Sequence, residues 1–470
     1  MKSKNLQHSL LAVTLAAALA GCATAVPPAV ELPQHRSEQA AVELDAWWTS
    51  FNDPTLTALI DEALAHNADV QTALTGVEQS KATLREARVA LLPDASLSLT
   101  SSRQNPSNEV SQPGQAGVGS NHRGGIAISY ELDLWGRVWK AKDAAAAMLL
   151  ASEYAKETTR AAVAAQTAKS YFALLALDAN EALLTQTLAT RDESLAIANA
   201  RYKVGAIGDY ELKLAETERA AVAAALPKAR AGRVQAEAAL AVLLGRNPKD
   251  VVEGRIERGN GLTKLAEAPE IPVGLSSDLL QRRPDVKRAE AQYAYAEALL
   301  GEARRRYFPS LSLTGFAGGE SASLSNLLDA PARTWNIAAS LLQPIVGMAR
   351  IDAQVDAAKS RKEAADIAYA QAARAAYGDA RAALAGHRGA RESLAATQVR
   401  AEAQNRVKVL TEQRYKAGVS SYLDLLNAER DRLAAERDHV SALQDRVDAL
   451  VTVYQALGGG WPGTRVAKAD

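Results

Sequence analysis

Residues Arg414-Tyr415-Lys416-Ala417-Gly418 have a near copy at Arg201-Tyr202-Lys203-Val204-Gly205, 213 residues earlier in the chain (414 − 201). Each copy lies between two long Ala-rich helical patterns. A Lys in the last turn of a helix, followed two residues later by a Gly that can take a positive φ, is typical of a helix end. We therefore expect two helical hairpins, each turning at one copy, in two versions of one duplicated unit.

The duplication extends on both sides of the two turns. Leu244-Gly245 matches Leu457-Gly458 in the same register, and Pro93 matches Pro309 at a spacing of 216 residues (309 − 93). Each unit is therefore expected to hold a helix, two strands and a long hairpin. The N-cap candidates for the returning hairpin helices are Asp209, Ser420 and Ser421.

Helical periodicity fills most of the two units. The expected helices cover about 56–92, 137–203 and 209–244 in the first unit, and about 277–307, 348–416 and 421–457 in the second. Asp53 and Pro54 are typical of the N-cap and first turn of the first helix. At about 1.5 Å per residue, the longest helices would be roughly 100 Å long, which exceeds any ordinary globular domain.

Alternating apolar residues predict two β-strands in each unit, with one apolar face. These residues are Leu97, Leu99, Ile126, Ile128, Tyr130, Leu132 and Leu134 in the first unit, and Leu311, Leu313, Trp335, Ile337, Ala339 and Leu341 in the second. The polar stretch at about 103–124 and the Gly- and Ser-rich stretch after Leu313 are interpreted as loops. Each strand has roughly the 9 to 11 residues that cross a bilayer when tilted. Four strands cannot close a membrane barrel, whereas three chains would supply twelve. A small soluble sheet is the alternative.

The first residues have the pattern of a processing signal. Lys2 and Lys4 precede an apolar run that is too short to cross a bilayer, and the run ends in Leu19-Ala20-Gly21-Cys22. This ending resembles the lipobox of bacterial lipoproteins, in which the Cys carries N-acyl and S-diacylglycerol lipid and becomes the first residue. Ala23, rather than an Asp, follows the Cys, which by resemblance to lipoprotein sorting rules favours the outer membrane. An ordinary signal peptide with an incidental Cys is the alternative.

Composition and pattern together divide the chain into six segments. They are a signal peptide (1–21), an N-terminal tether (22–52), a first repeat (53–245), an equatorial linker (246–275), a second repeat (276–457) and a C-terminal tail (458–470). The linker is distinguished by its Pro and Gly residues. We expect the tail to be loosely held.

The composition indicates neither nucleic-acid binding nor enzymatic chemistry. Lys and Arg number 54, as do Asp and Glu, so the formal net charge is zero and no basic surface for nucleic acid is indicated. The six His residues are scattered, and the sequence has no metal-ligand spacing, nucleophile elbow or phosphate loop. We therefore predict no catalytic residue, no metal site and no cofactor apart from the lipid on Cys22.

These features resemble the outer membrane factors of TolC-like tripartite exporters, most closely the lipoprotein branch that works with resistance-nodulation-division pumps. The matching residues are Cys22, Trp47-Trp48 with Asp53-Pro54, Pro93, Pro309, the two turn copies and Ala456-Leu457-Gly458-Gly459-Gly460-Trp461. The resemblance implies a mixed α and β membrane protein. It implies a homotrimer with a 12-stranded outer membrane β-barrel, four strands per chain, continued by a long periplasmic α-helical barrel. It also implies passive export of drugs or other solutes from an inner-membrane pump and a periplasmic membrane fusion (adaptor) protein.

The resemblance also assigns roles to residues at the two turns. Those expected to contact the adaptor are Arg201, Tyr202, Gly205, Arg414, Tyr415 and Gly418. Those expected to close the periplasmic end of the tunnel are Tyr415, Leu423, Asn427 and Arg430. Related lipoproteins often have Asp where this chain has Asn427. Asn427 can hydrogen-bond Arg430 but carries no charge, so Asp424, one turn earlier, is the alternative member of the ring.

Two alternatives stay open from the sequence. Tyr415 and Leu423 fit the packing of a hairpin as well as they fit a closing ring. The chain also fits a structural envelope lipoprotein, in which long helices brace the envelope without a transport role and no closed barrel is needed. The exported solutes, the pump and the adaptor are not indicated.

Overall fold

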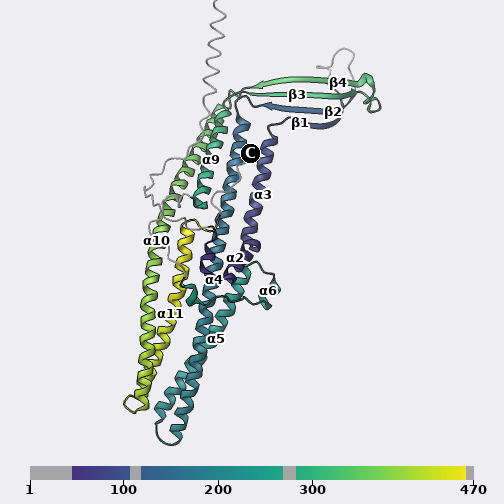
Figure 1. The fold of residues 1–470 in the computed structure, drawn as a ribbon. Helices are drawn as coiled ribbons and strands as arrows, with labels where there is room; N and C mark the ends of the chain where they lie inside the picture. Colours follow the sequence, from purple (N-terminus) through teal and green to yellow (C-terminus); the bar gives the residue numbers. More distant parts are fainter. Residues whose placement is uncertain (1–44, 106–117, 268–281, 462–470) are drawn as a thin grey trace, which may run out of the picture. The chain divides into compact units, whose positions relative to one another are not determined.

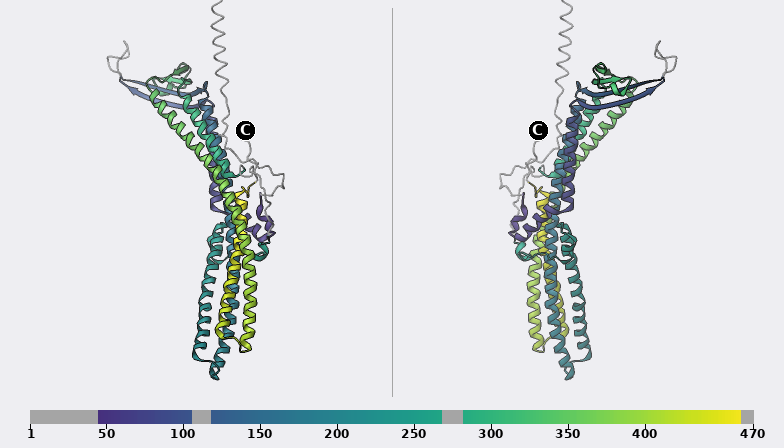
Figure 2. Two further views of the ribbon diagram at one scale, coloured as in Figure 1. Left: turned by 90° about the vertical axis from the view of Figure 1, so that its left-hand side faces the viewer. Right: turned by 90° about the vertical axis from the view of Figure 1, so that its right-hand side faces the viewer.

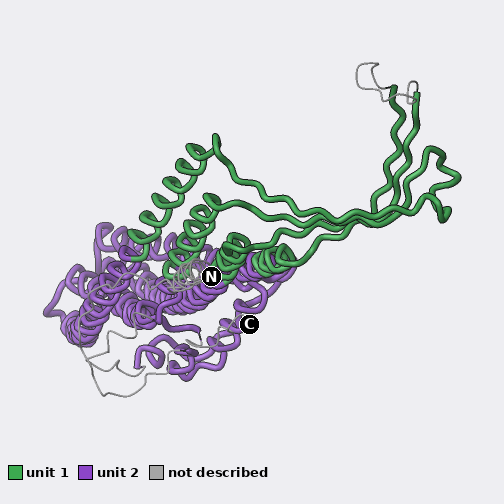
Figure 3. Tube along the Cα trace, turned by 90° about the horizontal axis from the view of Figure 1, so that it is seen from above, with its two compact units in different colours: residues 1–31, 80–149, 289–369 green, residues 32–79, 150–288, 370–470 purple. Residues whose placement is uncertain are grey.

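The computed structural model describes residues 45–105, 118–267 and 282–461. The predicted signal peptide and Cys22 lie outside these ranges. The described residues form two units, which Figure 3 colours separately. Unit 1 contains Ser80–Leu149 and Ala289–Tyr369, and unit 2 contains the remaining described residues. Each unit contains residues from both halves of the sequence. Four of the helices, α3 (Ala68–Val89), α4 (Arg137–Lys203), α9 (Pro284–Arg305) and α10 (Met348–Lys416), have residues in both units.

Unit 1 contains one antiparallel four-stranded sheet with its strands in chain order (Figure 1). The strands are β1 (Asp94–Gln104), β2 (Gly119–Leu132), β3 (Ser310–Ser321) and β4 (Arg333–Leu342). Leu97 opposes Ile126, and Tyr130 opposes Leu313. Opposed residues share a face, and side chains alternate along each strand, so this register gathers the predicted apolar residues on one face. Leu134 is the exception, because β2 ends at Leu132 and Leu134 lies in the turn that follows. The predicted strands and their single apolar face are confirmed.

Long helices make up most of the described chain. They are α3 (Ala68–Val89), α4 (Arg137–Lys203), α5 (Asp209–Leu243), α9 (Pro284–Arg305), α10 (Met348–Lys416) and α11 (Tyr422–Ala456). Shorter elements are η1 (Trp47–Phe51), α2 (Pro54–His66), α6 (Pro248–Glu253), α7 (Leu262–Leu265), η2 (Leu324–Asn326) and η3 (Ala330–Ala332). The longest two, α4 and α10, begin and end where the sequence predicts. Among the described residues, no helix combines the length and the apolar character that a membrane-spanning helix needs.

The two predicted turns share one backbone geometry. Gly205 and Gly418 have φ values of +71° and +78°. The amide after each Gly donates to the carbonyl of the Arg that begins each copy, at 2.9 and 3.0 Å. This six-to-one hydrogen bond is the Schellman motif that ends a helix. The positive φ recurs at Gly245 and Gly458, so the backbone repeats the duplication seen in the sequence.

The first helix is broken, contrary to the single helix expected over about 56–92. The break lies at Asn67, whose ψ of 134° is extended. Its Oδ1 accepts the backbone N–H of Asp69 and Val70 at 2.9 and 3.2 Å, and its Nδ2 donates to the Leu243 carbonyl at 2.9 Å. An Asn side chain can replace helical backbone hydrogen bonds in this way, so Asn67 ends α2 and caps α3. In the second half, α9 covers Pro284–Arg305, and the part of the expected helix at about 277–281 lies outside the described residues.

The strands extend into both stretches that the sequence analysis interprets as loops. β1 ends at Gln104, β2 begins at Gly119, and β3 continues to Ser321. Glycines of the two stretches lie where β2 and β3 approach closely, since a Cβ on Gly318 would lie 2.2 Å from the Gly124 carbonyl oxygen. Glycine is required here by crowding within the sheet, and its presence does not mark a loop.

The returning helices are capped differently in the two repeats. Asp209 is not an N-cap, because α5 begins at Asp209 itself and follows Gly208, whose N–H donates to Glu211 Oε2 at 3.1 Å. Ser421 is the N-cap of α11, as predicted. Its Oγ accepts the Asp424 N–H at 3.1 Å while Asp424 Oδ2 accepts the Ser421 N–H at 2.9 Å, which forms a reciprocal capping box.

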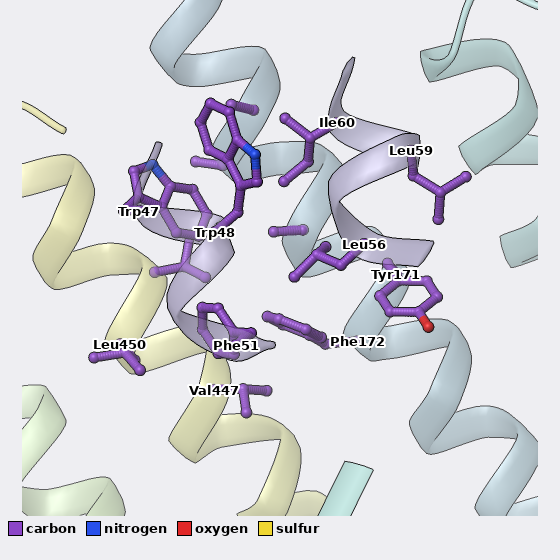
Figure 4. Packing of buried hydrophobic residues seen from close by; sticks show 14 of the residues in the cluster. Trp47, Trp48, Phe51, Leu56, Leu59, Ile60, Tyr171, Phe172, Val447 and Leu450 are labelled. Atoms are coloured by element: carbon purple, nitrogen blue, oxygen red, sulfur yellow. The ribbon is translucent and has the colours of Figure 1, made fainter. Parts of the chain in front are cut away.

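The main apolar core of unit 2 gathers around η1 and α2 (Figure 4). Trp47 is 1% exposed and stacks on Tyr454 with ring centroids 5.5 Å apart. Phe51 packs against Phe172 with centroids 5.2 Å apart. These aromatic side chains fix the beginning of the described chain against α4 and α11, where burial of apolar area stabilises the helices.

Asp53 is the predicted N-cap of α2 and also binds the equatorial linker. The buried carboxylate accepts the N–H of Thr55 and Leu56 at 2.9 and 3.3 Å. It also accepts the Tyr171 hydroxyl at 3.2 Å and the Asn260 N–H at 3.1 Å. Burial raises the pKa of Tyr171 to about 12, so the phenol stays a donor. One side chain therefore joins η1, α2, α4 and the linker.

The beginning of the predicted tail is buried, although the sequence analysis expects a loosely held segment over 458–470. Trp461 is 4% exposed and meets Tyr154 edge to face, with centroids 6.1 Å apart. Gly458 packs against Arg283 so closely that a Cβ would lie 3.1 Å from the arginine side chain. The expectation is wrong for residues 458–461 because apolar burial holds them. The residues after 461 lie outside the described ranges.

Asp448 on α11 is a poorly satisfied buried carboxylate. Its Oδ2 accepts Gln444 Nε2 at 3.3 Å, whereas its Oδ1 is buried with no hydrogen-bond partner among the described residues. Burial raises the pKa of Asp448 to about 6. The native state then holds this proton more tightly than the unfolded chain does. The contribution of Asp448 to stability is therefore fully present below pH 3.8 and is lost as the pH rises through about 6.

We therefore expect Asp448→Asn to raise the free energy of unfolding above pH 7 by about 1–3 kcal/mol, since it removes a buried charge. At pH 4 the gain should disappear. Thermal unfolding of the purified protein at both pH values measures the difference. Asp431→Asn, at an exposed position on the same helix, is the control. A gain of equal size at both pH values would contradict the assignment.

Candidate functional site at the hairpin tips

The tips of the two hairpins in unit 2 bring most of the predicted site residues together (Figure 2). Arg201 and Arg414 are exposed, and Tyr202 is 43% exposed. A Cβ on Gly205 or Gly418 would meet nothing within 4 Å, so these residues are Gly because of their positive φ. The predicted adaptor-contact residues are therefore available at the surface of the chain.

Arg201 and Tyr415 link one hairpin to the other. Arg201 Nη1 donates to the Tyr415 hydroxyl at 2.7 Å, and the guanidinium carbon lies 5.4 Å from the ring centroid. Arg414, which the repeat equates with Arg201, instead donates to Ser420 Oγ at 3.0 Å within its own turn. The two copies thus share a backbone but use their arginines differently.

A cavity of about 310 Å³ lies between the two tips. Ile197, Ala198, Ile207 and Leu425 give it an apolar lining, and the polar residues around it include Arg201, Lys408, Glu412 and Tyr415. Glu412 accepts Lys408 Nζ at 2.7 Å and Lys416 Nζ at 2.8 Å. These two hydrogen bonds lower the pKa of Glu412 to about 2. The ion pairs of Glu412 with Lys408 and Lys416 are therefore intact at neutral pH. Their stabilising effect is lost only as the pH falls from about 4.5 towards 2.

The predicted closing residues Leu423, Asn427 and Arg430 lie along one line of α11, at the i, i+4, i+7 spacing of a helix face. Leu423 is 44% exposed, and Asn427 and Arg430 are exposed. The possible Asn427–Arg430 hydrogen bond is not formed within the described chain. Asp424 is held by the cap, and its hydrogen bond with Ser421 lowers the pKa of the carboxylate.

Arg430 belongs to a partly buried ion cluster that joins the hairpins. It binds Glu218 of α5, which also lies 3.9 Å from Arg191 of α4. Arg191 binds Glu429, next to Arg430 on α11. The side chains of Arg191, Glu218 and Glu429 are only 4%, 8% and 11% exposed. Charges so far from water need their partners, so this cluster, called here the hairpin lock, holds α11 against α4 and α5.

The sequence analysis did not identify Arg191, Glu218 or Glu429 as site residues. Glu429 occupies the position of Glu216 in the repeat, yet the buried carboxylate of the first copy is Glu218, two residues further on. The analysis also missed two exposed apolar side chains beside the turn glycines, Val204 and Val419, at 78% and 64% exposure. The available signal was a Val directly beside the turn Gly in both copies.

The chain matches the sequence model of a family described as "Outer membrane efflux protein" over residues 59–246 and 275–459. The chain belongs to this family.

Known relatives match this efflux protein over most of its length. It is 32% identical to the outer membrane protein OprJ of Pseudomonas aeruginosa. This match covers 90% of the present chain and 88% of OprJ. It is 31% identical to the probable efflux pump outer membrane protein TtgC of Pseudomonas putida, covering 91% of this chain and 88% of TtgC.

Solved structures share the fold of this efflux protein. The CmeC outer membrane channel of Campylobacter jejuni has a TM-score of 0.85 and 28% identity, and covers 92% of this chain and 94% of its own. The open state of the MtrE outer membrane channel of Neisseria gonorrhoeae has a TM-score of 0.80 and 32% identity, covering 93% and 98%. The resemblance inferred from the sequence is confirmed, as are the mixed α and β channel fold and the outer membrane location. The roles at the tips stay predictions.

We expect the loss of a carboxylate inside the hairpin lock to destabilise the protein more than the loss of an exposed carboxylate near it. Glu218→Gln removes the carboxylate that binds Arg430 and neutralises a partner of Arg191. We expect the free energy of unfolding to fall by about 2–4 kcal/mol, because buried charges lose their partners. Asp192→Asn, which breaks an exposed pair with Arg219, should cost under about 1 kcal/mol. Denaturant unfolding of both variants in detergent makes the comparison. Similar costs for the two would show that the lock contributes no special stability.

Proposed function

We propose that three copies of this efflux protein close a twelve-stranded barrel in the outer membrane, with their long helices forming a tunnel through the periplasm. The trimer is then the passive exit channel of a tripartite system, and receives drugs or other solutes from an inner-membrane resistance-nodulation-division pump and its adaptor. The named relatives include efflux pump outer membrane proteins, which supports this assignment.

The sheet of unit 1 is the observation that carries the proposal. β1 pairs with β2 alone and β4 pairs with β3 alone, so two edges are open in the described chain. Its apolar face is exposed as well, with Leu97 at 85%, Ile337 at 78% and Trp335 at 74%. Apolar side chains at such exposure favour lipid over water, and open edges in lipid favour closure with strands of further copies. A structural lipoprotein without a barrel would leave this face in water.

The opposite faces of β4 provide a matched test. Ile337 lies on the apolar face and Ala338, also exposed, on the polar face that would line the channel. Ile337→Lys should reduce membrane insertion and the yield of trimer, since a lysine facing the bilayer costs about 2–4 kcal/mol. Ala338→Lys should give normal trimer with altered conductance. Heat-modifiable mobility on gels and planar-bilayer recordings measure both. A soluble sheet would tolerate the two substitutions equally.

The hairpin tips are proposed to meet the adaptor and to close the tunnel when idle. The exposed Arg201, Tyr202, Arg414 and the two turn glycines offer the docking surface, with Tyr415 held between the hairpins. Leu423, Asn427 and Arg430 lie on one face of α11, and Arg430 is part of the hairpin lock. In this proposal the tunnel opens when the lock breaks and α11 moves away from α4 and α5.

A lipid on Cys22 is proposed to anchor the mature chain to the outer membrane. Support comes from the lipobox-like sequence, because Cys22 is the single cysteine of the chain and stands directly after the apolar run. Each buried CH₂ of an acyl chain contributes about 0.8 kcal/mol to membrane binding. Cys22→Ser should abolish incorporation of labelled palmitate. Labelled Cys22→Ser protein would mean that the lipid is attached elsewhere.

A further inference from the structure

In unit 1, aromatic side chains gather where the sheet ends and the helices begin. Trp135 stacks on Phe308 with ring centroids 5.0 Å apart, and its Nε1 donates to the Pro309 carbonyl at 2.7 Å. Trp139, in the first turn of α4, is 52% exposed, and Lys142 Nζ lies 4.5 Å from its ring centroid. Half-exposed rings with a polar atom are typical of the boundary between lipid and water.

A further aromatic residue, Trp335, marks the opposite end of the apolar face. Trp335 on β4 opposes Ala317, which lies nine residues along the chain from Phe308 (317 − 308). Nine residues of strand rise about 30 Å, and a tilt of about 35–45° reduces this to roughly 23 Å. The apolar band of outer membrane barrels is about 25 Å tall. The two aromatic levels therefore place the Phe308 end at one surface of the membrane.

Basic residues are concentrated just beyond the Phe308 end. The four ten-residue segments that adjoin the sheet on the helical side are 83–92, 133–142, 300–309 and 343–352, called here the basic collar. The basic collar holds nine Lys and Arg but four Asp and Glu, whereas the whole chain is neutral. Its basic residues are spread over α3, α4, α9, α10 and the turn after α9, so they approach the membrane from every helix that meets the sheet.

Three basic-collar arginines have no side-chain partner among the described residues. Arg85, Arg304 and Arg350 are exposed, and none of these three side chains forms a hydrogen bond or ion pair there. The positive charges of these side chains are therefore not neutralised by ion pairs among the described residues. We propose that the basic collar binds the anionic headgroups of phospholipids in the periplasmic leaflet, with Trp135, Trp139 and Phe308 at the level of the headgroups. This inference rests on the proposed function, since it places the apolar face of the sheet in the bilayer.

The test compares two double variants of the full-length protein. Arg304→Gln with Arg350→Gln neutralises two of the three unpaired basic-collar arginines. The control, Lys359→Gln with Arg361→Gln, removes two exposed charges of α10 that lie about 17–20 Å further along the helix from Met348. That distance exceeds the Debye length of about 8 Å at physiological salt. Native mass spectrometry of the detergent-purified protein, titrated with phosphatidylglycerol or phosphatidylcholine, measures lipid bound per trimer.

The wild type and the control should bind phosphatidylglycerol more tightly than phosphatidylcholine. The Arg304/Arg350 variant should lose about 25-fold in phosphatidylglycerol affinity, at about fivefold for each charge. An intact trimer whose affinity is unchanged, or falls equally in the control, would overturn the basic collar as a lipid surface. Displacement of the lipid by excess inorganic phosphate would overturn it too, by showing a site for a free ion. Absence of trimers in the wild type would instead contradict the proposed function.

Discussion

An apolar sheet with two open edges is the constraint on which the rest of the structure depends. In the described chain, the outer edges of β1 and β4 have no ladder partner, and Leu97, Leu99, Ile337 and Leu341 on the apolar face are more than half exposed. A sheet of this kind is costly in water and equally costly in lipid when it stands alone. Pairing with strands of further copies completes the backbone hydrogen bonds at the two edges, and lipid covers the apolar face.

Unit 2 is stabilised in two different ways along its helices. Around η1 and α2 the contacts are aromatic and aliphatic, and the largest side chains are almost completely buried. Near the tips the apolar cluster shrinks to Ala198, Leu212 and Ala215 with a few partly buried neighbours. Charged pairs supply much of the remaining contact there. A region held by a few polar contacts separates at lower cost than an apolar core, so the tips are the part of unit 2 best able to move.

Much of the fold follows from local sequence patterns. The alternation at Leu97 and Leu99 predicts a strand, and the turn glycines predict both hairpins, because backbone geometry is set within a few residues. The break at Asn67 is harder to predict, since its amide is fixed by the distant Leu243 carbonyl. The hairpin lock is harder still. Periodicity shows that Arg191 and Glu218 lie on helices, but it does not show which charged helix faces contact one another. The family resemblance pointed to Arg430 as a site residue but did not identify the residues that bind it.

The repeated Schellman turn has a consequence for the symmetry of recognition. Two turns with the same backbone on each chain would give six similar projections around a threefold axis. A ring of six identical partner subunits could then engage a trimer without a mismatch in number. The side chains limit this equivalence, because Arg201 reaches across to Tyr415 while Arg414 stays within its own turn. Gene duplication would thus give each chain two similar contact sites. Divergence of their side chains would allow alternate partner subunits to bind with unequal affinity.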